Sequence, residues 1–165
     1  MLFRSCQFHA PNCHKPGVEL QVMKGACPFA MWGLDLLGPF PRAPGQLLYA
    51  IVAIDYFTKW IKVVPLARTT ATEVKKFLWK NVICRFGLPQ QIVTDRGPQF
   101  NTPIIRSWLE DMGILYTLES TRHAEGNGQV EAANKSIVED LGKRCMEAKG
   151  KWAEYLPLTD RKSVV

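Results

Sequence analysis

The stretch "IVTDRGPQF" (Ile92–Phe100) joins a short apolar run to a carboxylate and then to a glycine and a proline. A short apolar run bounded by turn formers is typical of a buried strand, so Asp95 is predicted to stand where such a strand ends. An Asp in this position is most often a turn former. Asp95 indicates a catalytic or metal-binding role only if other carboxylates reach the same end of the sheet.

The segments around this stretch predict a sheet with helices packed on its faces. Three apolar runs come first and suggest an antiparallel meander, and strands then alternate with helices, which implies a mixed sheet in an α/β domain. Thr72 is the expected cap of the first helix, and Gly87 is expected to end it. The expected strands lie within the apolar runs 31–38, 47–57, 59–66, 90–95 and 114–120, with residues 55–59 as the short connection between the second and the third. The expected helices are 70–87, 103–113 and 128–150.

Length and composition limit the class of protein. The 165 residues are 47% hydrophobic and 22% charged, which suits one well-cored domain. The formal net charge of +6 and the pI of about 9.2 favour a polyanionic partner such as nucleic acid. No signal peptide or apolar run of membrane-spanning length is present, so no membrane association is expected. The five cysteines have no repeating spacing, which favours reduced thiols.

Three acids occupy positions that a purely structural protein would rarely give them. Asp35 interrupts the apolar strand "WGLDLLG", Asp95 ends the strand described above, and Glu131 lies in the first turn of the long helix. Carboxylates gathered at one point repel by about 4 kcal/mol per pair at 4 Å and an effective dielectric of 20. A divalent cation removes that repulsion, and oxygen ligands suit Mg²⁺ or Mn²⁺.

Each acid also has a structural interpretation. Asp95 can form the turn, Glu131 can complement the helix dipole, and Asp35 can be paired inside the fold. Asp55, in "VAIDYFTKW", is a rival candidate ligand, but it falls between two expected strands and is interpreted as a turn residue.

Four motifs carry a resemblance to a known family: "WGLDLLGPFP", "IDYFTKWIKVVPL", "RFGLPQQIVTDRGPQF" and "HAEGNGQVEAANK". Together they resemble the catalytic core of retroviral-type integrases, and most closely that of gypsy-type LTR retrotransposons of plants. The step from Asp95 to Glu131 is 131 − 95 = 36, which leaves 35 intervening residues, as in the family's D,D(35)E motif. The resemblance implies a ribonuclease H-like fold, with a five-stranded mixed sheet flanked by helices. It also implies that Asp35, Asp95 and Glu131 are the catalytic residues and metal ligands.

The resemblance implies a function and its partners. It predicts DNA integration, in which two Mg²⁺ or Mn²⁺ ions support 3′-end processing and strand transfer of retroelement DNA into target DNA. The expected partners are DNA and, in the full-length protein, further copies of the chain. The expected site of action is the nucleus, with a cytoplasmic particle before it, although no targeting signal is seen. Two alternatives stay open: a catalytically inactive nucleic-acid-binding remnant, and a ribonuclease H-like nuclease.

The long helix and the loop before it supply the expected DNA contacts. Lys135 lies four residues after Glu131 and therefore on the same helix face, although a solvated lysine is an equal alternative. Asn134, Gln129 and Asn127 are expected DNA contacts by the same motif, and the glycines around Asn127 give a permissive backbone there.

The ends of the chain depart from the family pattern. Residues 1–28 are interpreted as a linker or remnant after a missing N-terminal zinc module, since the His and Cys spacing expected of that module is absent; no zinc site is expected. The catalytic core is assigned to residues 29–159 and is expected to be truncated at its C-terminal end. Residues 160–165, "DRKSVV", match the translation of a sequencing-adapter read-through, so we expect an artefactual tail from Asp160 onward.

Overall fold

The computed structural model describes residues 27–118, 138–140 and 142–159. Most of the expected N-terminal linker, the segment with Glu131 and the expected DNA contacts, and the expected tail lie outside the described residues.

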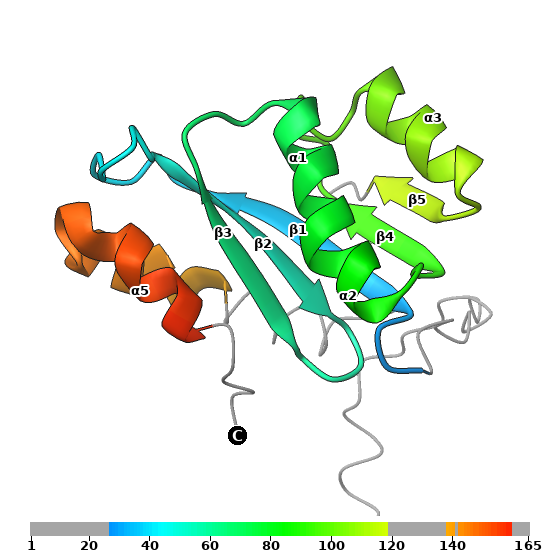
Figure 1. Ribbon diagram of the computed structural model, residues 1–165, viewed down its shortest axis with the longest axis horizontal. Coiled ribbons are helices and arrows are strands. Elements are labelled where there is room, and N and C mark those ends of the chain that lie inside the picture. The colour runs from blue at the N-terminus through cyan, green and yellow to red at the C-terminus, as the bar shows by residue number, and fades with distance from the viewer. Residues whose placement is uncertain (1–26, 119–137, 141, 160–165) are drawn as a thin grey trace, which may run out of the picture.

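The described residues form a five-stranded sheet in the order β3-β2-β1-β4-β5 (Figure 1). The first three strands form the expected antiparallel meander, while β4 pairs parallel to β1 and β5 parallel to β4. The prediction of a mixed sheet is therefore confirmed. The strands are β1 (Met31–Leu37), β2 (Tyr49–Asp55), β3 (Ile61–Leu66), β4 (Gln91–Thr94) and β5 (Leu115–Leu118).

The first helical segment differs from the expectation in its cap and its interior. Its N-cap is Thr70, whose hydroxyl accepts from the Glu73 backbone N–H, so the predicted cap at Thr72 was wrong by two residues. The middle of the segment is a π-helix, and Gly87, at φ 88°, ends it as predicted. The helices are α1 (Ala71–Phe77), the π-helix η1 (Leu78–Ile83), α2 (Cys84–Phe86), α3 (Pro103–Asp111), the 3₁₀ turn η2 (Lys149–Lys151) and α5 (Trp152–Thr159), with residues 138–140 and 142–147 also helical.

Each face of the sheet carries its own hydrophobic core. The first core lies under α1, η1, α2 and α3. Figure 1 shows α1 and α2 crossing this face of the sheet, with α3 beside β5. Alternate residues of β1, Trp32 and Leu34, point into the first core. The second core lies on the opposite face, where Val52 and Val63 of the sheet pack with Cys145 and α5. The alternation of β1 therefore assigns Asp35 to the face of the second core.

Helix α5 is an element that the sequence reasoning did not identify. It lies beside β3, at the opposite edge of the sheet from α3 (Figure 1). Trp152 and Leu156, one helical turn apart, are each 1% exposed, and Trp152 Nε1 donates to the Pro41 carbonyl at 2.6 Å. This i, i+4 pair was the available sequence signal. Among the described helices, none combines the length and apolar character needed to cross a membrane.

Candidate metal and DNA site

The pairing of β1 with β4 brings two of the predicted acids to the same level of the sheet. The parallel register runs from Met31 beside Gln91 to Leu34 beside Thr94. Asp35 is the next residue of β1, and Asp95 directly follows Thr94, the last residue of β4. Neighbouring strands lie about 4.8 Å apart. The carboxylates are close enough that the charge of Asp95 contributes to raising the pKa of Asp35.

Asp35 is in an environment that disfavours its charge. Burial is the main cause of its raised pKa, the backbone N–H of Leu36 opposes that rise by donating to Oδ1 at 2.7 Å, and the charge of Asp95 adds to it. The side chain is still partly exposed, so an ion from solvent can reach it. A cation beside the two acids would reverse both unfavourable contributions.

Asp95 is held by the turn that follows β4. Its Oδ1 accepts from the Gly97 backbone N–H at 3.0 Å, and a Cβ on Gly97 would lie 3.0 Å from that same oxygen. Glycine at position 97 therefore lets the turn fold closely around the carboxylate. Tyr116 also holds this turn, because its hydroxyl donates to the Phe100 carbonyl at 3.0 Å.

The donor set fits a hard divalent cation. Within the described residues, hydrogen bonds occupy one oxygen of Asp35 and one of Asp95, so each carboxylate has a second oxygen for a metal. In that same part of the chain, no three His, Cys, Asp or Glu side chains gather as a metal site. The predicted third ligand, Glu131, lies outside the described residues, as do Lys135, Asn134, Gln129 and Asn127.

Asp55 is a structural residue, as predicted. It is fully buried at the end of β2, and its carboxylate accepts from Phe29 N, Thr58 N and Thr58 Oγ1 at 2.6 to 3.0 Å. These bonds satisfy the carboxylate within the fold and fix the turn before β3. The Asp55 carboxylate is therefore engaged in hydrogen bonds within the fold.

The structure describes three of the five cysteines. Cys27, Cys84 and Cys145 are free thiols, as expected from their spacing. Burial raises the pKa of Cys145 to about 11, so that this thiol stays protonated at neutral pH.

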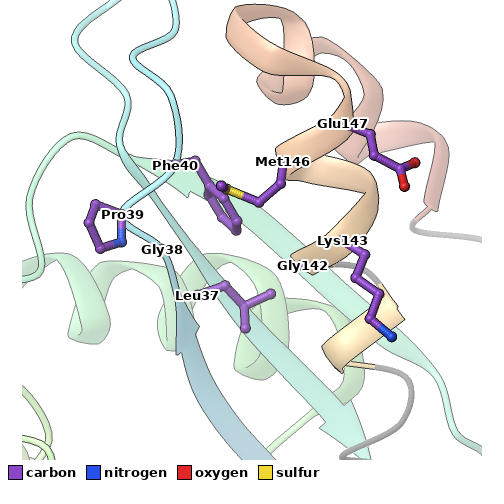
Figure 2. Close-up of a pocket in the computed structure, with 8 residues that line it drawn as sticks. All are labelled: Leu37, Gly38, Pro39, Phe40, Gly142, Lys143, Met146 and Glu147. Atoms are coloured by element: carbon purple, nitrogen blue, oxygen red, sulfur yellow. The ribbon is translucent and has the colours of Figure 1, made fainter.

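A pocket that the sequence reasoning did not predict lies two residues along β1 from Asp35. Its volume is about 500 Å³, and it opens between the end of β1 and the helical residues 142–147. Figure 2 shows Phe40 and Met146 directed toward one another across it, with the charged ends of Lys143 and Glu147 pointing outward. Leu37 shares its strand face with Asp35, so the pocket continues the surface that carries the acid.

The fold and its acidic sheet end define a class of protein: a mixed five-stranded sheet flanked by helices, of the ribonuclease H-like type. The catalytic core domain of BIV integrase superimposes with a TM-score of 0.61 at 17% identity, covering 82% of this chain and 87% of that one. A simian T-cell lymphotropic virus intasome, solved in complex with PP2A regulatory subunit B56 gamma, matches with a TM-score of 0.55 at 23% identity, over 70% of this chain and 41% of that chain.

Sequence similarity identifies the family. The integrase core domain matches residues 25–124, a range that includes Asp35 and Asp95. The chain belongs to the integrase core domain family. It is 33% identical over 135 residues to the Gag-Pol polyprotein of avian reticuloendotheliosis virus, and 32% identical over 136 residues to that of koala retrovirus. These alignments cover 82% of the chain but only 12% and 8% of the two polyproteins. The narrower likeness to gypsy-type plant elements stays a prediction.

Proposed function

We propose that this chain is the catalytic core of an enzyme that integrates retroelement DNA into target DNA. The observation that carries the proposal is the parallel pairing of β1 with β4, which aligns Asp35 with Asp95 in a chain of the integrase core family. The proposed reaction has two steps of the same kind: water trims the 3′ ends of the element's DNA, and each new 3′-hydroxyl then attacks a phosphodiester of the target.

The proposed cofactor is a pair of Mg²⁺ or Mn²⁺ ions. Asp35 and Asp95 would hold them together with Glu131, the third acid of the predicted triad. When bound, such ions activate the attacking oxygen and stabilise the leaving oxygen of an in-line displacement. The support for this part is the chemistry of the donor set, since two partly solvated carboxylates at one level of the sheet repel one another without a cation.

The protein's own contribution is to hold the acids rigidly and to bind DNA. The register of two strands fixes Asp35 and Asp95, and the turn at Gly97 orients the second carboxylate. Lys135, Asn134, Gln129 and Asn127 are the proposed DNA contacts. Further copies of the chain are proposed partners, because one of the matching structures is an intasome. The nucleus is the proposed site of action, and a cytoplasmic particle the proposed location before it.

The test is a strand-transfer and disintegration assay on branched DNA with Mg²⁺ or Mn²⁺. We expect metal-dependent joining by the unaltered chain, lost in Asp95→Asn and Glu131→Gln while both variants keep the melting temperature of the folded chain. Joining that persists in these variants would reject the assigned acids. Metal-dependent cleavage without joining would favour a nuclease, and DNA binding that is insensitive to metal and to both substitutions would favour a non-catalytic remnant.

A further inference from the structure

We propose that the hydroxyl of Tyr56 is an additional DNA contact beside the acidic site, and that Gly33 lets the Tyr56 ring lie close against β1, where a larger residue would displace it. This inference rests on the proposed function, because the DNA it describes is the substrate of that same site.

The position of Tyr56 follows from its backbone and from Gly33. Its backbone N–H donates to the Met31 carbonyl at 2.9 Å, just beyond the end of β2. A Cβ placed on Gly33 would lie 2.9 Å from Tyr56 Cε1 and 3.0 Å from Tyr56 Oη. The ring therefore runs along β1 and ends with its hydroxyl over Gly33.

Gly33 and Asp35 lie on the same face of β1. Gly33 pairs with Ile54 and Asp35 pairs with Val52, and both partners belong to the second core. Residues i and i+2 of a strand are separated by roughly 6 to 7 Å. The Tyr56 hydroxyl is therefore about that far along the strand from the acid, a separation that one phosphate group of a bound strand can bridge.

The Tyr56 side chain has the chemistry for this contact. A phenol can donate to a phosphate oxygen, and contacts of this kind position DNA without reading its sequence. A phenol is a neutral hydrogen-bond donor, so it adds no further repulsion beside two carboxylates. Its half-buried ring also exposes apolar surface to a sugar or a base.

The turn that carries Tyr56 is held in place before any ligand binds. The neighbouring Asp55 is fully buried and accepts three hydrogen bonds, two from Thr58 and one from Phe29. A contact residue on such a fixed turn loses little conformational entropy when DNA binds.

The first experiment compares Tyr56→Phe with the unaltered chain. The variant keeps the ring over Gly33 and removes only the hydroxyl, and binding is compared at a temperature at which both chains are folded. Fluorescence anisotropy on branched DNA at fixed salt should give a Kd about tenfold higher, as expected for loss of a hydrogen bond to a charged group. In the joining assay, KM should rise by a similar factor while kcat changes less. The control is Phe57→Leu, in the same turn and 54% exposed, which should leave Kd unchanged.

A second experiment tests the role of Gly33 through a double-mutant cycle. Gly33→Ala should displace the ring and weaken DNA binding at least as much as Tyr56→Phe does. In a Tyr56→Ala background, where the ring is absent, the same Gly33→Ala change should have little further effect. Equal losses in both backgrounds would overturn the proposed link between the two residues.

The outcomes separate the inference from the proposed function. If the unaltered chain binds and joins DNA and Tyr56→Phe behaves identically, the inference is wrong and the proposed function stands. If the unaltered chain binds no DNA, both are wrong. A raised Kd in Tyr56→Phe with an unchanged melting temperature supports the contact, since a role in packing alone would be retained by phenylalanine.

Discussion

Within the part of the chain that the structure describes, the two faces of the sheet differ in how completely they are covered. On the first face, α1 to α3 bury a continuous apolar core in which Phe29 stacks on Phe86 at 4.5 Å between ring centroids. On the second face, α5 and the helical residues 142–147 cover the sheet only in part, leaving Asp35 partly exposed and a pocket beside Leu37. Both faces therefore contribute hydrophobic packing, and the second face also carries Asp35.

The environment of Asp35 on the second face has a cost in stability. Burial and the charge of Asp95 raise the pKa of Asp35, which means that the ionised form needed for a metal is disfavoured by the fold. A site of this kind lowers stability unless a cation binds. Packing on the first face offsets that loss, because it does not depend on the acids.

The largest effect is expected from opening the first face. Leu109 on α3 is fully buried, so Leu109→Ala should lower the free energy of unfolding by about 2 to 5 kcal/mol through lost burial and a residual cavity. The control is Ile104→Ala on the same helix, which is 58% exposed and should change stability by less than about 0.5 kcal/mol. Urea denaturation measures the free energy of unfolding of both variants. Similar losses of stability in the two variants would contradict the view that α3 buries Leu109 in a closed core.

On the second face, Asp35→Asn should separate activity from stability. Strand transfer should fall by more than about a hundredfold, because the substitution removes a proposed metal ligand itself. This loss should exceed the loss expected from changing a residue that only contacts a metal ligand. The melting temperature should stay the same or rise, since a neutral amide removes the disfavoured charge. Asp111→Asn, at the exposed end of α3, is the matched control and should leave joining intact. A destabilised Asp35→Asn chain would assign this acid a structural role instead.

A smaller effect is expected where α5 attaches to the second face. Trp152→Phe keeps an aromatic ring but loses the hydrogen bond from Nε1 to the Pro41 carbonyl. The free energy of unfolding should fall by about 1 to 2 kcal/mol. Trp79→Phe, at a site 49% exposed, should be close to neutral in the same denaturation experiment. Equal behaviour of the two variants would mean that α5 contributes little to this face.

The smallest effect concerns pH. The pKa of Asp35 is raised in the folded chain above its ordinary 3.8, so protonated Asp35 stabilises the fold fully below about pH 3.8. That contribution is lost as pH rises through the raised folded-state pKa. In EDTA, the melting temperature of the unaltered chain relative to Asp35→Asn should therefore decline over the pH range just above 3.8. A difference that grows with pH would reverse the sign of the assigned shift.

The local pattern of the sequence predicted most elements but missed those that depend on distant partners. Alternation and helical spacing located all five strands, α1 to α2 and α3, because each has its apolar period within one segment. Helix α5 was missed because its signal is a single apolar pair, and what stabilises it includes a carbonyl 111 residues away. The cap was assigned to Thr72 rather than Thr70 because both threonines stand near the start of the same apolar period; the structure places Thr70 before the first helical residue, Ala71, and Thr72 inside the helix.

The sequence by itself determined that Asp35 and Asp95 each interrupt or end an apolar strand, and its motifs identified the family to which the chain belongs. Only the tertiary structure decided that β1 and β4 are parallel neighbours with these acids at one level, that Asp55 is used internally, and that Tyr56 lies over Gly33. The physical reason is that strand pairing and face alternation join residues far apart in the chain, and no local period records which strands will meet.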